Sequence, residues 1–146
     1  MMFKTIAMAA DHAGYALKEQ IKTYLVEKGI EVKDFGTYSE ESCDYPDYAH
    51  PMASAVVSKE YEIGISICGS GNGINMTVNK YPEVRAALCW QNEISYMARL
   101  HNNANICSLP ARYLSYEQAV EIVDTFLNTE FEGGRHQGRI DKIPIK

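Results

Sequence analysis

Cys68 stands at the head of a short glycine-rich segment, residues 68–73. The segment follows an apolar run typical of a buried strand, residues 63–67, and residues 74–80 after it can start a helix. The positive end of a helix dipole favours a thiolate over a thiol, and bare backbone N–H groups at the same place attract anions. This segment therefore offers a base or nucleophile together with a cradle for an oxyanion.

The glycine pattern by itself leaves a second interpretation open, which is a simple tight turn. It reads G-x-G-x-G rather than the G-x-G-x-x-G of dinucleotide-binding turns, it follows the third predicted strand, and it lacks the lysine of a phosphate-binding P-loop. The cysteine favours a functional site, because a thiol at this point is expected to face the helix dipole rather than to be buried.

Further polar residues could take part in chemistry near Cys68. Asp11 and His12 follow the first predicted strand, where His12 could contact an anion and Asp11 a sugar hydroxyl, although a solvated loop explains them equally well. Tyr45 lies in a rigid turn that begins a helix and could point its hydroxyl into a cleft, or simply belong to the helix start. His101, followed by Asn102, ends a predicted helix, and histidine is the side chain best suited to proton transfer near neutral pH.

The end of the chain contains two arginines four residues apart, Arg135 and Arg139. If this segment is helical, they lie one turn apart on one face and form a fork suited to a phosphate. A solvated basic tail is the plain alternative. No group of His, Cys, Asp and Glu has the spacing of a metal site, so we expect no metal.

Strand patterns alternate with helix patterns along the whole chain. Strands are predicted at residues 3–9, 30–35, 63–67, 84–89 and 105–109, and helices at 15–28, 48–59, from 74, 92–100, 115–127 and after 133. Alternation of this kind, with strands apolar nearly throughout, is typical of a parallel sheet covered on both faces. We predict one α/β domain over residues 1–146, an open doubly wound sandwich of the Rossmann or flavodoxin type with five parallel strands in the order 2-1-3-4-5.

In such sheets, ligands bind beyond the carboxyl ends of the strands. Asp11, His12, segment 68–73 and Arg112 all follow strands, so they are expected to meet at that edge. His101 instead precedes the fifth strand, which places it at the opposite end of the sheet from Cys68.

Composition narrows the class of protein. The chain has 146 residues and a formal net charge of −5, which suits one domain with a real core and argues against a nucleic-acid binder. The start runs straight into a strand pattern, and no apolar stretch approaches the ~18–20 residues that span a bilayer. The four cysteines form no C-x-x-C pair. We therefore expect a reduced, cytoplasmic protein without a membrane segment.

The motifs together resemble the ribose-5-phosphate isomerase type B family, which also contains the galactose-6-phosphate isomerase subunits. The resemblance runs in order along the chain: residues 10–14 (ADHAG), 44–46 (DYP), 67–73 (ICGSGNG), 79–80 (NK), 101–105 (HNNAN), Arg112 and 132–137 (EGGRHQ). It implies an aldose–ketose isomerase of the pentose phosphate pathway, without metal or cofactor, that interconverts ribose 5-phosphate and ribulose 5-phosphate through a cis-enediolate.

The resemblance also implies a role for each motif. Cys68 is the base that moves a proton between C1 and C2, and His101 opens the sugar ring as a proton donor, with Asn102 beside it. Backbone N–H groups hold the enediolate oxygens, and the residues concerned are Gly69, Ser70, Gly71, Asn72 and Gly73. Asp11 binds sugar hydroxyls, and the remaining substrate contacts, mostly to the phosphate, come from His12, Arg112, Arg135 and Arg139. Some members use a glutamate just after the glycine run as base, whereas this chain has Ile74 there and keeps Cys68.

Members of that family are homodimers or homotetramers whose active site is shared between two subunits, which would account for the distant His101. Three alternatives stay open. One is an isomerase of a six-carbon sugar phosphate, such as allose 6-phosphate or galactose 6-phosphate, and another is a non-catalytic phosphosugar-binding module. The third is a thiol-based redox protein, which the lack of a nearby resolving cysteine disfavours.

Overall fold

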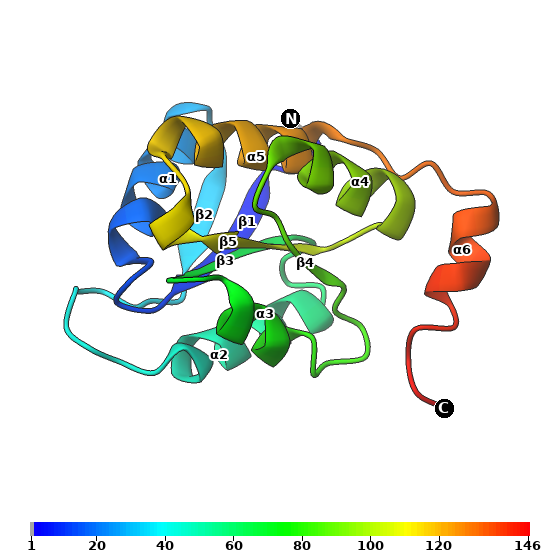
Figure 1. The fold of residues 1–146 in the computed structure, drawn as a ribbon, viewed down its shortest axis with the longest axis horizontal. Coiled ribbons are helices and arrows are strands. Elements are labelled where there is room, and N and C mark those ends of the chain that lie inside the picture. The colour runs from blue at the N-terminus through cyan, green and yellow to red at the C-terminus, as the bar shows by residue number, and fades with distance from the viewer. Residues whose placement is uncertain (1) are drawn as a thin grey trace.

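A five-stranded, all-parallel sheet forms the centre of the fold (Figure 1). The structure is a computed structural model and describes residues 2–146. The strands are β1 (Thr5–Ala10), β2 (Glu31–Asp34), β3 (Gly64–Cys68), β4 (Ala86–Leu88) and β5 (Ile106–Pro110). The helices are α1 (Tyr15–Glu27), α2 (Tyr45–Val57), α3 (Asn72–Val78), α4 (Asn92–Asn102), α5 (Tyr116–Asn128) and α6 (Arg135–Ile140), with a 3₁₀ turn, η1 (Ala111–Tyr113), after β5.

The strand order is β2-β1-β3-β5-β4. The predicted fold class is therefore confirmed, but the predicted order 2-1-3-4-5 is wrong for the last two strands. The reason lies in their burial, since every residue of β5 is buried whereas the three residues of β4 are only half-buried. The longer, fully buried β5 takes the interior position beside β3, and the three-residue β4 forms the edge of the sheet.

Helices cover both faces of the sheet, as the near-continuous burial of β1, β3 and β5 requires. Figure 1 shows α1, α4 and α5 on one face and α2 and α3 on the other. Each face has its own apolar core: Ile21, Ile65 and Phe126 belong to the first, and Met52, Ile74 and Ile106 to the second. None of the helices described for residues 2–146 combines the length and apolar character needed to cross a bilayer.

The helix boundaries follow local sequence signals. Ser115 caps α5 through a capping box, in which its hydroxyl accepts from Gln118 N at 3.1 Å and Gln118 Oε1 accepts from Ser115 N at 2.9 Å. Helix α2 begins three residues earlier than predicted, at Tyr45, because Pro46 is well suited to a first helical turn. Helix α6 continues through Gly138, so Arg135 and Arg139 are one turn apart, as the spacing predicts.

Candidate active site

Cys68 is the last residue of β3 and is almost fully buried, with 4% of its surface exposed. It packs into the apolar core on the side of α2 and α3, together with Ala49 and Ile74. The expectation that this thiol escapes burial is therefore wrong. It is buried because β3 is an interior strand and both helices cover the end of it.

The glycine-rich segment after Cys68 makes a close turn into α3, which begins at Asn72 rather than at Ile74. Gly71 has a φ of 76°, and a Cβ there would lie 2.5 Å from Leu88 Cδ1, so only glycine fits. The first turn of a helix leaves backbone N–H groups without intrahelical partners. The N–H of Asn72 donates to Ser70 Oγ at 3.2 Å, so this donor has a partner within the turn.

Arg112 lies directly on this turn, as predicted. Its backbone N–H donates to Gly69 O at 3.0 Å, and a Cβ on Gly69 would lie 2.9 Å from Arg112 Nη1. The guanidinium therefore covers the backbone next to Cys68 and brings a positive charge to the place where an anion would bind.

The β1–α1 loop brings Asp11 to the same edge. Asp11 N donates to Ile67 O at 3.2 Å, so Asp11 lies beside the end of β3. Its side chain is buried, and Asp11 Oδ1 accepts from Gly14 N at 3.0 Å. A carboxylate has about four acceptor positions on two oxygens, so capacity remains for substrate hydroxyls after this one bond.

His12 and Tyr45 complete the group at this edge. His12 Nδ1 accepts from Cys43 N at 3.2 Å, which places the proton of a neutral ring on Nε2, where it can be donated to an anion. The sequence did not point to Cys43 in this role. The Tyr45 ring lies against Gly73, since a Cβ on Gly73 would be 2.4 Å from Tyr45 Cζ and 2.6 Å from its hydroxyl oxygen.

The other predicted residues lie at the opposite end of the sheet. His101 and Asn102 end α4, and the chain then enters β5 through Asn105, whose carbonyl accepts from Gly64 N at 2.9 Å. Gly64 begins β3 and Cys68 ends it, a length of roughly 13 Å at ~3.3 Å per residue. Helix α6, with Arg135 and Arg139, packs beside α4 at this same end (Figure 1). The predicted site therefore divides into two groups. The carboxyl-edge group consists of Asp11, His12, Tyr45, Cys68, the turn 69–73 and Arg112, and the amino-edge group consists of His101, Asn102, Arg135 and Arg139.

The end of α4 is held firmly by two other arginines. Arg85 Nε donates to Asn102 O at 3.1 Å and Arg85 Nη2 to Asn103 O at 3.0 Å. Arg99 Nη1 donates to Ala104 O at 2.6 Å and Arg99 Nε to Thr129 O at 3.2 Å. Burial lowers the pKa of both guanidinium groups, and for Arg99 the nearby charge of Arg85 adds to the effect.

His101 belongs to a cluster that the sequence did not predict. Glu132 Oε2 lies 3.5 Å from His101 Nε2 and 2.9 Å from His136 Nε2, and the two imidazole rings are stacked with centroids 4.2 Å apart. One ligand atom from each residue lies within 4.8 Å of the others, so the three could approach a metal ion. The rings are only 17° from parallel, and both Nε2 atoms face the same carboxylate oxygen, Glu132 Oε2, which suits hydrogen bonding to the carboxylate.

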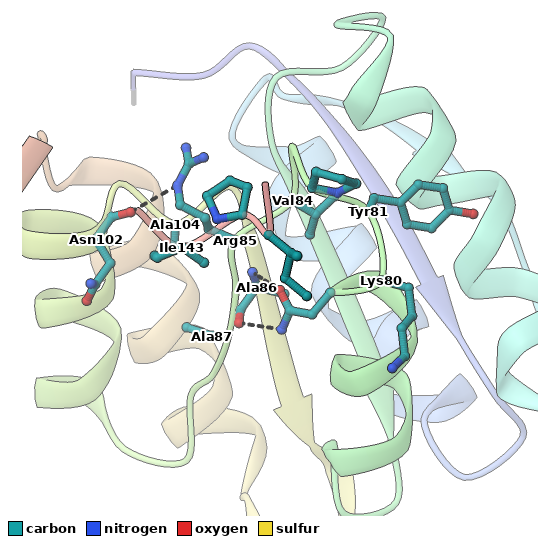
Figure 2. Close-up of a pocket in the computed structure, with 13 residues that line it drawn as sticks. Lys80, Tyr81, Val84, Arg85, Ala86, Ala87, Asn102, Ala104 and Ile143 are labelled. Atoms are coloured by element: carbon teal, nitrogen blue, oxygen red, sulfur yellow. Dashed lines mark hydrogen bonds between the residues drawn. The ribbon is translucent and has the colours of Figure 1, made fainter. Parts of the chain in front are cut away.

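Two cavities flank these groups. The larger, about 580 Å³, lies at the amino edge, and Figure 2 shows Asn102, Arg85 and Ile143 around it. The smaller, about 410 Å³, lies beside the glycine-rich turn and is lined by Ser70, Asn72, Leu88, Trp90, Pro110 and Tyr113. Cys68 lines neither cavity, so in the single chain the amino-edge opening and the thiol are separate features.

Comparison with known proteins gives one consistent result. Residues 6–143 match the Ribose/Galactose Isomerase family. Ribose-5-phosphate isomerase B of Escherichia coli (strain K12) is 44% identical over 140 residues, 96% of this chain and 94% of that protein. The structure of a ribose 5-phosphate isomerase from Thermotoga maritima has a TM-score of 0.94 and 54% identity, and the match covers 96% of this chain and 97% of that one.

A second solved structure holds a ligand. It is ribose-5-phosphate isomerase B from Mycoplasma genitalium with bound ribulose-5-phosphate, with a TM-score of 0.91 and 42% identity over 95% of this chain and 93% of that one. The similarity to these proteins extends over nearly the whole chain.

Proposed function

The chain belongs to the Ribose/Galactose Isomerase family, and we propose that it interconverts ribose 5-phosphate and ribulose 5-phosphate through a cis-enediolate. The observation that carries this proposal is the placement of Cys68 at the carboxyl end of β3, under a turn of backbone donors and beside Asp11. Side chains and backbone suffice for every step of the scheme. The four free thiols fit a reducing, cytoplasmic setting.

Proton transfer between C1 and C2 is assigned to Cys68. Its thiolate removes the C2 proton of the open-chain aldose, the hydroxyl proton on O2 passes to O1, and the Cys68 thiol then donates a proton to C1, which leaves the C2 ketone and regenerates the thiolate. Negative charge is shared by O1 and O2 while the enediolate exists. Backbone N–H groups of Gly69, Ser70, Gly71, Asn72 and Gly73 are proposed to hold those oxygens, that of Asn72 after it leaves Ser70 Oγ. A base next to a preorganised oxyanion site is the combination that this reaction needs. Asp11 and Tyr45 are proposed to hold the sugar hydroxyls.

Ring opening is assigned to His101. Its imidazolium protonates the ring oxygen, the C1–O4 bond breaks, and the proton of the C1 hydroxyl then passes to the neutral imidazole. His101 therefore ends the step protonated, as it began, and C1 becomes the aldehyde. Asn102 lies beside it, and the phosphate is proposed to be bound by His12, Arg112, Arg135 and Arg139.

These roles require two subunits. Because His101 and α6 lie at the amino ends of the strands, we place the amino-edge group in the active site of a neighbouring subunit of a homodimer or homotetramer. Each complete site then takes Cys68, Asp11 and His12 from one subunit and His101, Arg135 and Arg139 from the other.

The test is an activity panel on the purified protein with ribose 5-phosphate, allose 6-phosphate and galactose 6-phosphate, with Cys68→Ala as control. We expect the wild-type protein to form ribulose 5-phosphate from ribose 5-phosphate, and we expect no such product with the Cys68→Ala control. A six-carbon substrate is the second candidate, because the 410 Å³ cavity beside Ser70 and Asn72 leaves room near the turn. A panel without any isomerisation would overturn the proposal in favour of a binding module.

A further inference from the structure

Within the cluster of His101, Glu132 and His136, only His101 has a role in the reaction scheme proposed above. We propose that Glu132 and His136 are positioning residues that fix the His101 imidazole for ring opening. The proposal rests on the function proposed above, and it adds two residues that neither touch Cys68 nor belong to the phosphate fork.

The geometry points to Glu132 as the link between the two rings. Its Oε2 accepts from His136 Nε2 at 2.9 Å and lies 3.5 Å from His101 Nε2, a separation that a small movement on substrate binding would close to a hydrogen bond. His136 is buried and its ring stacks on the imidazole of His101, so it supports one face of that imidazole. His101 itself is one-third exposed and can reach a substrate.

The backbone around the cluster holds these side chains in place. Glu132 N donates to Leu100 O at 2.9 Å, which ties Glu132 to the residue before His101. Gly133 and Gly134 both have positive φ values, 76° and 61°, and this tight turn lets residues 132 and 136 face each other. The cluster is therefore built from two segments locked together at the end of α4.

The chemical consequence is a defined proton position. An ionised carboxylate only accepts hydrogen bonds, so Glu132 requires a proton on Nε2 of each histidine. The Nδ1 atom of His101 is then the nitrogen that exchanges a proton with the sugar, and the ring is held in one orientation. Loss of the partner that orients a metal-bound histidine typically costs about 10–100-fold in function, and we expect an effect of the same order for His101.

The experiment separates ring opening from proton transfer at carbon. Ribulose 5-phosphate is open-chain, because its O5 carries the phosphate and cannot close a ring onto the C2 carbonyl. Exchange of its C1 proton with D₂O, followed by NMR, therefore reports the Cys68 step alone, whereas turnover of ribose 5-phosphate also requires ring opening. The variants are Glu132→Gln, which keeps the shape and loses the charge, and His136→Leu, with His136→Gln as a matched control that keeps an N–H donor.

We expect Glu132→Gln and His136→Leu to lower turnover of ribose 5-phosphate by about 10–100-fold while C1 exchange stays at the wild-type rate. His136→Gln should keep more turnover than His136→Leu. Arg135→Ala, on the same helix, should weaken both reactions, because both substrates carry the phosphate. Equal losses in the two assays for Glu132→Gln would show a structural or phosphate-binding role, and unchanged turnover would show no role. Either result overturns the proposal.

The same assays separate this proposal from the proposed function. If the wild-type protein fails to exchange the C1 proton of ribulose 5-phosphate, or if Cys68→Ala exchanges it normally, the proposed function fails whatever the Glu132 variants do. If exchange depends on Cys68 and only the Glu132 and His136 effects are missing, the function stands and the positioning role is refuted.

Discussion

Two individually inactive variants, Cys68→Ala and His101→Ala, should restore activity when their subunits are mixed. The structure supplies the reason, since Cys68 ends β3 whereas His101 ends α4 beyond the other end of that strand, roughly 13 Å away along β3 alone. If each site takes Cys68 from one subunit and His101 from its neighbour, a mixed dimer has one pocket with both defects and one with none. The mixed dimer should therefore show about half of the wild-type activity, and a random mixture about one quarter.

The assay is conversion of ribose 5-phosphate after the two variants have been mixed under conditions of subunit exchange, with exchange confirmed by native mass spectrometry. A matched control pairs Cys68→Ala with His12→Ala. Both of those residues lie at the carboxyl edge of one subunit, so every pocket of the mixed dimer keeps one defect and no recovery is expected. Absence of recovery for the Cys68–His101 pair, with exchange demonstrated, would refute the shared site.

Four further predictions test the roles of particular residues. Arg135→Ala or Arg139→Ala should raise KM for ribose 5-phosphate by about 10–150-fold, which is the equivalent of ~1.5–3 kcal/mol for a charge-assisted contact. Turnover of unphosphorylated ribose should stay unchanged. Equal effects on both sugars would contradict the phosphate role. Lys18 is fully buried against Asp34, so Lys18→Ala should lower the free energy of unfolding by about 3 kcal/mol and the partly exposed Lys22→Ala by less than ~1 kcal/mol, as urea titration can measure. Burial works to raise the pKa of Asp34, but hydrogen bonds from Lys18 and Lys22 outweigh it and hold that pKa below 3.8. The contribution of Asp34 to the free energy of unfolding should therefore be complete above pH 3.8 and be lost as pH falls through the lower folded-state pKa. Asp34→Asn should remove this pH dependence. Gly73→Ala should displace the Tyr45 ring and reduce turnover by about 10–100-fold. The control is Gly138→Ala, whose new Cβ would have no atom within 4 Å; it should stabilise α6 by ~0.5–1 kcal/mol and leave turnover unchanged. Similar turnover for the two variants would show that activity does not require a fixed position of the Tyr45 ring.

Local signals in the sequence were sufficient for most of the fold. The helix pattern over residues 115–127 locates α5, and the apolar runs of β1, β3 and β5 indicate a sheet covered on both faces. The order of the last two strands could not be derived in this way. It depends on how deeply β5 and the three-residue β4 are buried, and burial is a property of the packed sheet rather than of either segment.

Part of the candidate site could likewise be predicted from the sequence, and part could not. The carboxyl-edge group of Asp11, His12, Cys68 and Arg112 could be predicted, because each residue follows a parallel strand and such strands end at one edge. The burial of Cys68 was missed, since it depends on how α2 and α3 pack over the end of β3, which the local sequence does not reveal. Two further contacts join segments about 30 residues apart, a separation at which sequence spacing does not predict contact. They are the contact of His12 with Cys43 and the contacts of His101 with Glu132 and His136.

The most direct test of the account is the rate at which the protein exchanges the C1 proton of ribulose 5-phosphate with D₂O, compared between the wild type and Cys68→Ala. Proton transfer by Cys68 predicts exchange by the wild type and a loss of roughly two to four orders of magnitude in the variant, the usual worth of a general base. The folded state of the variant is checked by its thermal unfolding. Exchange by folded Cys68→Ala at close to the wild-type rate would contradict the assignment of Cys68 as the base.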